Sequence, residues 1–282
     1  MLDKAIHKTI EELLDEEIVQ ATPLTGGDIN SVSKITTSQA TYVIKVNHHA
    51  TAHAMFTAEE EGLKALASSK TFKIPGVIAV GEKNKTAFIL MEFIASKPKA
   101  KTHDPEFGRM LARLHKNTFA KFGFTNHNFI GTLPQYNQQL EKAADFYIQM
   151  RLMPQLEMAA KNGFRFNLGR LFKNITTLIP EEPPALVHGD LWSGNAITDA
   201  NGHPCLIDPA VFYGHRETDL AMMQLFGGFS KQIFDSYQNN YPLEKNWRQR
   251  IDIWQLYYLL VHVNLFGSSY YGSVKNIIEK YA

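Results

Sequence analysis

Two aspartates and one asparagine occur in this chain in an order that suits phosphoryl transfer. Residues 188–195 read His-Gly-Asp-Leu-Trp-Ser-Gly-Asn, and Asp208 follows 13 residues after Asn195. Asp190 is placed to accept the proton of an attacking hydroxyl. Asn195 and Asp208 are placed to hold Mg²⁺ against nucleotide phosphates, because this cation prefers oxygen ligands. We therefore predict Asp190, Asn195 and Asp208 as catalytic residues, the last two as metal ligands.

The segments around these residues decide between chemistry and an ordinary turn. An apolar run at 185–187 enters the loop, and a short strand at 196–198 leaves it. A turn at 199–202 and a strand at 205–207 then lead back to Asp208. This pattern predicts a hairpin with the loop at one end and Asp208 at the other. His-Gly-Asp at 188–190 or Ile-Asp-Pro at 207–209 alone could be an ordinary turn at the end of a strand. Both together, in this order and spacing, indicate an ATP-dependent kinase.

Two features nearer the N-terminus could handle the phosphates of the nucleotide. Gly26 and Gly27 lie between two expected strands, and glycines let backbone N–H groups approach phosphate closely. Lys45 lies in the following strand, Val43-Ile44-Lys45-Val46, which resembles the strand whose lysine pairs with the α- and β-phosphates in kinases. The structural alternatives are a plain hairpin turn and a solvated lysine. We predict all three residues as nucleotide-binding.

A helix expected over residues 54–68 supplies a carboxylate for Lys45. At 3.6 residues per turn, Glu59 falls beside the apolar face that includes Phe56, and Glu60 lies further from that face. We therefore predict that Glu59 forms the ion pair that orients Lys45, with Glu60 as the alternative. A solvated glutamate would be the structural interpretation.

The strand at 88–94 leads into an expected boundary between two lobes. It reads Phe-Ile-Leu-Met-Glu-Phe-Ile. In kinase-like folds a hinge of this kind contacts adenine through its backbone. Met91 would line the pocket behind the base, and the carbonyl of Glu92 and the N–H of Ile94 would pair with the edge of the base.

The composition is that of a globular protein with a sizeable core. Of the 282 residues, 44% are hydrophobic and 20% are charged, and the net charge of +1 gives no electrostatic case for binding nucleic acid. The single cysteine, Cys205, is expected to be a buried thiol. Residues 251–266 are apolar but interrupted, and they fall short of about 20 clean apolar residues, so we expect a buried helix and no membrane attachment. Residues 1–17 lack a signal-peptide core, which favours the cytoplasm.

Strands dominate the first part of the chain and helices the rest, which predicts an α+β fold of two lobes. We expect an N-terminal nucleotide-binding lobe over residues 1–93, with an antiparallel sheet and one helix. A mostly helical catalytic and substrate lobe would cover residues 94–282. The expected elements of the first lobe are helices at 2–17 and 54–68, two strands within 21–46 with a turn near 37–40, and strands at 74–81 and 86–94.

With these residues in place, nearly the whole chain resembles the fructosamine and ketosamine kinases, relatives of the aminoglycoside phosphotransferases within the protein-kinase-like fold. The most specific motifs are 188–195 and Asp-Pro-Ala-Val-Phe-Tyr-Gly-His-Arg-Glu-Thr-Asp-Leu-Ala at 208–221, and residues 225–229 and 264–267 add to them. The resemblance implies ATP and Mg²⁺ as cofactors. It also implies phosphorylation of the sugar 3-hydroxyl of a ketosamine, which is a glycated amine, either small or protein-bound. The product would decompose and free the amine, so the activity would serve deglycation.

The C-terminal lobe would select the sugar. Trp192 could cover a hydrophobic sugar face. His215 and Glu217 could bond hydroxyls or the amine, and a structural role for these two is equally open. Three further residues are expected to be structural: His115, His188 and Asp219, the last by bonding the backbone of the catalytic loop.

The chain also departs from its relatives. Many of them carry Cys after the glycine pair, where this chain has Asp28, so a thiol switch is not expected there. Gly189 stands where protein kinases usually have Arg, and no Ala-Pro-Glu segment follows Asp208. Control by a phosphorylated activation loop therefore lacks its usual arginine partner, which favours a constitutively active small-molecule kinase.

Two other functions stay open. A kinase of the same fold could act on an aminoglycoside, choline or a thio-sugar. A site for polycationic aminoglycosides should carry many acidic residues, but the segment 264–282 has one acidic residue, Glu279. A nucleotide-binding module without turnover is the second alternative, and the presence of every predicted catalytic residue argues against it.

Overall fold

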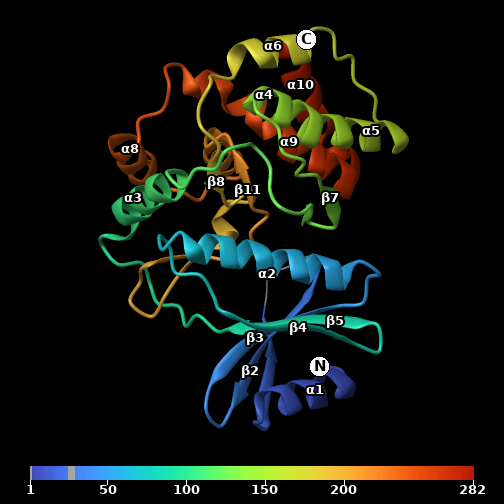
Figure 1. The fold of residues 1–282 in the computed structure, drawn as a ribbon, viewed down its shortest axis with the longest axis vertical. Coiled ribbons are helices and arrows are strands. Elements are labelled where there is room, and N and C mark those ends of the chain that lie inside the picture. The colour runs from blue at the N-terminus through green and yellow to red at the C-terminus, as the bar shows by residue number, and fades with distance from the viewer. Residues whose placement is uncertain (1, 25–28) are drawn as a thin grey trace. The chain divides into compact units, whose positions relative to one another are not determined.

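The computed structural model describes residues 2–24 and 29–282, so Gly26 and Gly27 lie outside the described residues. By its internal contacts the chain divides into an N-terminal unit, Met1–Ala100 with Ile197–Asp208, and a C-terminal unit, Lys101–Ala196 with Pro209–Ala282. An antiparallel sheet dominates the first unit, and helices dominate the second (Figure 1). The α+β class is thus confirmed.

A five-stranded antiparallel sheet forms the N-terminal unit, with strand order β1-β2-β3-β5-β4. Its strands are β1 (Ile18–Pro23), β2 (Ser31–Thr37), β3 (Thr41–Asn47), β4 (Val77–Lys83) and β5 (Thr86–Glu92). The turn expected between β2 and β3 is present, because the Thr37 N–H donates to the Ala40 carbonyl at 2.9 Å. The sheet brings Lys45 opposite Ile89 of β5.

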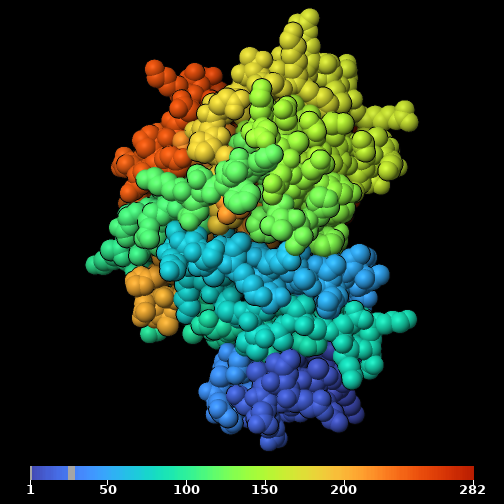
Figure 2. All heavy atoms as spheres, viewed as in Figure 1, coloured from blue at the N-terminus to red at the C-terminus, as the bar shows by residue number. Residues whose placement is uncertain are grey.

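Alternation along β5 gives this sheet two apolar faces. On one face, Phe88 and Leu90 join the buried side of helix α1 (Lys4–Leu14). On the other face, Ala87, Ile89 and Met91 pack with helix α2 (Ala52–Ser68). The opposite side of α1 is polar, and Figure 2 shows this helix in dark blue on the molecular surface. One helix thus covers each face of the sheet, and α2 is the one that carries Glu59.

Residues 197–208 belong to the N-terminal unit, although we expected the division at residue 93. Strand β9 (Ala196–Thr198) pairs with β10 (Pro204–Leu206), as the expected hairpin. Within the unit, the Leu206 N–H donates to the Lys73 carbonyl at 3.1 Å, and the Lys97 N–H donates to the Asp199 carbonyl at 3.1 Å. Such long-range pairing leaves no local mark in the sequence, which is why the sequence division differs from the structural one.

The C-terminal unit contains two short strand pairs among its helices. The pairs are β6 (Asn128–Ile130) with β7 (Leu133–Gln135), and β8 (Ala185–Val187) with β11 (Phe212–Gly214). Its α-helices are α3 (His103–His115), α4 (Ala143–Phe146), α5 (Met153–Lys161), α6 (Leu171–Leu178), α7 (Glu217–Leu225), α8 (Lys231–Asn240), α9 (Trp247–Phe266) and α10 (Tyr271–Tyr281). Three shorter turns complete it: the π-helical η1 (Tyr147–Leu152), and η2 (Ser193–Asn195) and η3 (Gly267–Tyr270) of 3₁₀ type.

Helix α9 supplies much of the core of the C-terminal unit. Trp254, Tyr257 and Tyr258 on this helix are each 1% exposed. The buried helix expected at 251–266 is therefore confirmed. None of the helices in the described part of the chain has the length and hydrophobicity of a membrane span.

Candidate active site

Lys45 is the centre of a buried ion cluster in the N-terminal unit. Its Nζ atom lies 2.7 Å from Glu59 Oε1 and also donates to the Asp208 carboxylate. Glu60 instead pairs with Lys64 at 2.7 Å, where the Lys64 side chain is 67% exposed. The predicted Lys45–Glu59 ion pair is confirmed over its alternative.

The two carboxylates keep Lys45 charged. Burial alone would lower the pKa of Lys45, but the charges of Asp208 and Glu59 outweigh burial and raise it. A lysine held this way is a fixed positive charge with a defined direction. That is what pairing with nucleotide phosphates requires.

Asp208 combines an exposed carboxylate with an unusual backbone. Its φ of 54° is in the left-handed region, which a residue with a side chain rarely adopts. Its side chain is 42% exposed although the carboxylate also accepts from Lys45. Strained backbone of this kind concentrates at functional sites, because the surrounding structure must hold it. The geometry therefore supports Asp208 as a residue with a specific task.

In the C-terminal unit, the backbone of the catalytic loop before Asp190 is fixed by buried groups. The N–H groups of His188 and Gly189 donate to the Asp219 carboxylate at 2.8 and 2.9 Å. The Tyr258 hydroxyl donates to the Gly189 carbonyl at 2.8 Å. Asp219 is thus the scaffold acid that we expected.

His115 completes the support of Asp219. Its Nε2 atom lies 3.2 Å from Asp219 Oδ2, and its Nδ1 atom lies 2.9 Å from the hydroxyl of Tyr237. Burial alone would raise the pKa of Asp219, but hydrogen bonding and charge from His115, together with the Gly189 N–H, lower it. The structural roles expected for His115 and His188 agree with this arrangement, and His188 Nδ1 also accepts from the Asp190 N–H at 3.3 Å.

Asn195 lies against Asp190. Its Nδ2 group donates to the Asp190 carbonyl at 2.9 Å and approaches Asp190 Oδ2 at 3.3 Å. This contact commits the amino side of the amide to Asp190, an orientation compatible with a cation on the carbonyl side. No group of three or more His, Cys, Asp or Glu side chains in the described residues forms a metal cage.

Trp192 lies on the surface of the catalytic loop. Its side chain is 42% exposed, and its indole covers Gly194 so closely that a Cβ atom there would lie 2.1 Å from the ring. The Trp192 N–H donates to the Asp190 carbonyl at 3.1 Å. An exposed indole two residues from Asp190 can contact an acceptor, so the structure is compatible with the predicted role.

An aromatic cluster next to this loop was not among the predicted site residues. His262 of α9 lies 5.0, 5.5 and 4.8 Å, between ring centroids, from Phe226, Phe266 and Tyr270. Phe226 and Phe266 are 43% and 51% exposed. The Phe226 segment reaches the catalytic loop at Gly228, where a Cβ atom would lie 2.6 Å from the Ser193 side chain. The resemblance had marked residues 225–229 and 264–267 as motifs, without giving their side chains a role.

The structure buries His215 and Glu217 instead of presenting them to a substrate. Glu217 is 0% exposed and is bonded by Arg250 at 3.0 Å and by the Trp254 indole N–H at 2.9 Å. His215 is 2% exposed and stacks on Trp254 at 4.8 Å. Of the two interpretations left open by the sequence, the geometry supports the structural one, because the loop after Asp208 turns these side chains into the core.

The hinge residues differ in exposure. Met91 is 4% exposed within the cluster that α2 covers, and Ile94 is 8% exposed. The Glu92 side chain is about half exposed and lies 3.4 Å from Lys73. A buried Met91 behind the strand fits the predicted pocket wall, and the adenine contacts of Glu92 and Ile94 stay predictions.

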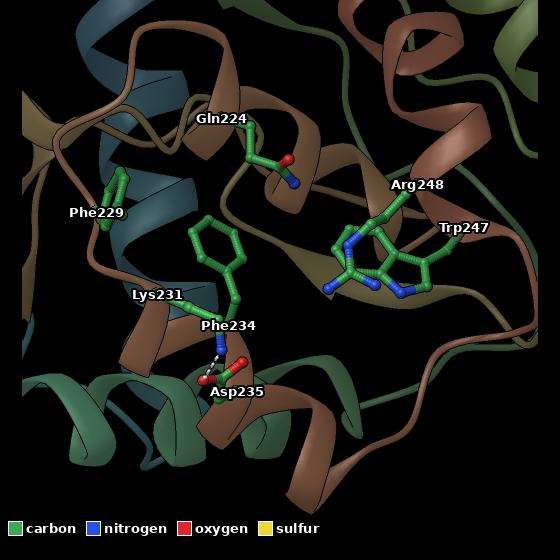
Figure 3. A pocket seen from close by; sticks show the side chains of 7 residues that line it. All are labelled: Gln224, Phe229, Lys231, Phe234, Asp235, Trp247 and Arg248. Carbon is green, nitrogen blue, oxygen red and sulfur yellow. Dashed lines mark hydrogen bonds and ion pairs between the residues drawn. The ribbon is translucent and has the colours of Figure 1, made fainter.

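The C-terminal unit contains a cavity of about 280 Å³. Figure 3 shows the side chains that line it, which come from α7, α8, α9 and the segment between α7 and α8. Lys231 and Asp235 pair across one side at 2.6 Å, and the Arg248 guanidinium lies 4.5 Å from the Trp247 ring. Its charges therefore already have partners. None of the residues predicted for catalysis or binding lines this cavity.

The comparisons with known proteins decide the family. Residues 2–282 match the sequence profile of a family described as Fructosamine kinase. The chain is 41% identical over 267 residues to a "Probable ketoamine kinase" of Enterococcus faecium, covering 92% of this chain and 94% of that protein. This protein belongs to the fructosamine kinase family. It is also 35% identical over 270 residues to a chloroplastic protein-ribulosamine 3-kinase of Arabidopsis thaliana, covering 91% of this chain and 80% of the plant protein.

Solved structures agree with this assignment. A crystal structure of a candidate fructosamine-3-kinase from Thermobifida fusca superimposes with a TM-score of 0.88 at 29% identity, over 99% of this chain and 98% of that one. An aminoglycoside phosphotransferase gives a TM-score of 0.63 at 18% identity over 99% of both chains, which shows the shared kinase-like fold alone. As a member of a kinase family, the protein uses ATP as its phosphoryl donor.

Proposed function

We propose that this protein transfers the γ-phosphoryl group of ATP to the sugar 3-hydroxyl of a ketosamine, small or protein-bound. The observation that carries the proposal is the catalytic loop itself: Asp190 has a fixed backbone, and Trp192 stands exposed two residues away. The names of the relatives supply the class of acceptor. An ATP-dependent reaction fits the cytoplasm, and that location is part of the proposal.

The proposed reaction needs positioning and charge neutralisation more than covalent chemistry. Asp190 accepts the proton of the sugar hydroxyl while the oxygen forms a bond to the γ-phosphorus. The bond between that phosphorus and the β–γ bridging oxygen breaks, and ADP leaves with the electron pair. Lys45, oriented by Glu59, neutralises phosphate charge. Asn195 and Asp208 are proposed as ligands of Mg²⁺, which supplies further neutralisation when bound.

The nucleotide site is proposed to include the residues predicted from the sequence. The backbone at Gly26 and Gly27 would approach the phosphates, and Met91 would lie behind the adenine, whose edge would pair with the backbone of Glu92 and Ile94. The ligand role of Asp208 can be tested by substitution. Asp208→Ala should remove the part of the ADP-induced rise in melting temperature that depends on Mg²⁺. An unchanged metal-dependent rise would exclude Asp208 as the ligand.

The acceptor side supports a sugar over a polycation. Trp192 in the catalytic loop and Phe226 and Phe266 in the aromatic cluster around His262 are exposed, and aromatic faces suit the apolar face of a sugar or the alkyl chain of a glycated lysine. Two acids of this unit, Glu217 and Asp219, are fully buried and already bonded within the fold. These two acids are therefore not available to pair with the amines of an aminoglycoside.

Coupled ADP-release assays test the acceptor directly. Ribulosyl-lysine and fructosyl-lysine should be phosphorylated, with kanamycin and choline poorer by about 10⁴-fold, because a site that bonds hydroxyls rejects molecules that leave its polar groups unpaired. Trp192→Ala should impair acceptor use while leaving nucleotide affinity unchanged. Phe119→Ala is the matched control, since Phe119 is 49% exposed and stacks on Tyr213 instead. Turnover of kanamycin with inert ketosamines would overturn the acceptor and leave only the kinase.

A further inference from the structure

A buried hydrogen-bond network of side chains, which we call the amide network, lies against the catalytic loop. None of its members was predicted as a site residue from the sequence. The amide network begins in β6 and β7. Its members, each no more than 6% exposed, are Asn128, Gln135, Asn137, Arg151 and Tyr257. Buried polar groups of this kind persist only when their hydrogen bonds are satisfied, so their partners show what they hold in place.

Both ends of the Gln135 side-chain amide are hydrogen-bonded. Its Nε2 group donates to the Ala210 carbonyl at 3.0 Å and to Asn128 Oδ1 at 2.8 Å. Its Oε1 atom accepts from the Tyr257 hydroxyl at 2.8 Å. Because Tyr257 is the donor to Oε1, the amide has one orientation, and that orientation directs its N–H to Ala210.

Ala210 is the link to the catalytic loop. Its N–H donates to the His188 carbonyl at 2.9 Å. Gly189, at φ 82°, passes so close that a Cβ atom there would lie 2.0 Å from the Ala210 carbonyl oxygen. The Ala210 carbonyl to which Gln135 donates therefore packs directly against Gly189, the residue before Asp190. Tyr258, next to Tyr257 on α9, holds the Gly189 carbonyl from another direction.

Arg151 binds the end of the amide network that lies away from Ala210. Its Nη2 atom donates to Asn137 Oδ1 at 2.7 Å, and Asn137 donates in turn to Asn128 Oδ1 at 2.9 Å. The guanidinium lies 4.0 Å from the centroid of the Phe212 ring. Burial lowers its pKa to about 10, and in the described part of the chain no carboxylate pairs with it. A buried cation without an ion pair is costly to keep, which argues for a specific role of this arrangement.

We propose that Gln135 is a positioning residue for phosphoryl transfer: it fixes the Ala210 carbonyl beneath Gly189 and so holds the Asp190 carboxylate in its reactive orientation. This inference rests on the proposed function. Gln135 does not reach the substrate itself, and it acts through backbone that is already bonded on both sides.

The test compares two buried amides. Gln135→Met keeps the volume and removes the donors to Ala210 and Asn128. Gln155→Met is the matched control, because Gln155 is 2% exposed and accepts two hydrogen bonds from the Asn264 amide of α9. In Gln135→Met we expect kcat to fall about 10- to 100-fold, with KM for ATP unchanged, since small misplacements of reacting groups have effects of this size. In Gln155→Met we expect a similar loss of melting temperature and a kcat within twofold of the parent.

Tyr257→Phe is a milder variant that guards against misfolding, because it removes only the hydroxyl that orients the Gln135 amide. It should lower kcat about 3- to 10-fold with the same unchanged KM for ATP. If Gln135→Met keeps a kcat within twofold of the parent, or if both methionine variants lose kcat in proportion to melting temperature, the positioning role is overturned.

Amide hydrogen exchange separates this inference from the proposed function. The N–H groups of His188 and Gly189 should exchange at least tenfold faster in Gln135→Met than in the parent, and at the parental rate in Gln155→Met. A parent without activity on any ketosamine would overturn the proposed function alone, and the exchange result would still test the support of the loop. Unchanged exchange in Gln135→Met would overturn the inference whatever the acceptor.

Discussion

The two aspartates that we propose for catalysis are held by different means. Asp208 belongs to a cluster of charges in the N-terminal unit, where Lys45 contacts it and Glu59 together. Asp190 follows backbone that is held in the C-terminal unit by Asp219, by the Tyr258 hydroxyl and, through Ala210, by neutral amides. This cluster tolerates loss of its central cation poorly, because removing Lys45 takes away the cation that pairs with the largely buried Glu59 carboxylate. The backbone before Asp190 is held instead by separate hydrogen bonds with several groups, the Asp219 carboxylate, the Tyr258 hydroxyl and, through Ala210, the Gln135 amide among them.

The difference also decides what a sequence reveals. Lys45, Glu59, Asp190 and Asp208 have chemical types and spacings that point to one reaction, and the helical period alone chose Glu59 over Glu60. The supporting residues could not be found that way. Asn128, Gln135 and Asn137 lie on either side of a turn at Gly131, where amide side chains are usually exposed, and only the fold shows that they are buried.

Two other expectations meet the same physical limit. His215 and Glu217 were open to two interpretations, because a polar residue shortly after Asp208 in the sequence can face a substrate or the core. Only the three-dimensional course of the chain brings Arg250 and Trp254 to Glu217. The division by internal contacts differs from the expected one for a related reason, since the bond between Leu206 and Lys73 joins residues far apart in sequence.

The largest effect is expected at Asp190 itself. Asp190→Asn removes the proton acceptor while keeping the shape, so turnover should fall about 10²- to 10⁴-fold and nucleotide binding should persist. Steady-state kinetics and calorimetric titration with ADP measure the two quantities. Turnover within tenfold of the parent would exclude Asp190 as the base.

Lys45→Met tests the charged side of the comparison. It leaves Glu59 and Asp208 facing each other without their cation, and breaking a buried ion pair from one side destabilises a protein by about 3–5 kcal/mol. Lys64→Met is the control, because the exposed Lys64–Glu60 pair is worth at most about 0.5 kcal/mol. Urea unfolding of both variants measures the difference. Equal stabilities would show that the cluster does not hold the fold.

The pH dependence of stability tests whether His215 belongs to the buried frame. Burial lowers the pKa of this histidine from 6.5 to about 4, with the charges of Arg216, Arg250 and His115 acting in the same direction and that of Glu217 opposing them. The Glu182 carboxylate also lies 3.7 Å from its ring. The unfolded chain therefore binds more protons than the native chain in the window between these values.

Stability should consequently fall as pH drops from 6.5 towards 4, by about 3 kcal/mol for this group, since each pKa unit is worth about 1.4 kcal/mol. His215→Phe should flatten this part of the curve. His203→Phe, at a half-exposed histidine, should not. Urea unfolding at a series of pH values measures the slopes, and equal slopes in the parent and His215→Phe would contradict the buried neutral state.

The smallest effect is expected among the hydrogen bonds that hold the catalytic-loop backbone. Tyr258→Phe removes one of several bonds to the catalytic loop and leaves the buried Gly189 carbonyl with one partner fewer, which should destabilise the fold by about 1–3 kcal/mol. Turnover should fall several-fold, much less than in Asp190→Asn. If Tyr258→Phe were as inactive as Asp190→Asn, the support of the loop would not be distributed as described here.

Phosphorus NMR of the reaction mixture tests the central claim most directly. With ATP, Mg²⁺ and ribulosyl- or fructosyl-lysine, the parent protein should convert the γ-phosphate signal into a new phosphomonoester signal as ADP forms. That signal should then decay as free lysine appears, and Asp190→Asn should produce neither change. ADP formation without a sugar phosphomonoester, or a phosphomonoester formed on kanamycin but on no ketosamine, would contradict the account.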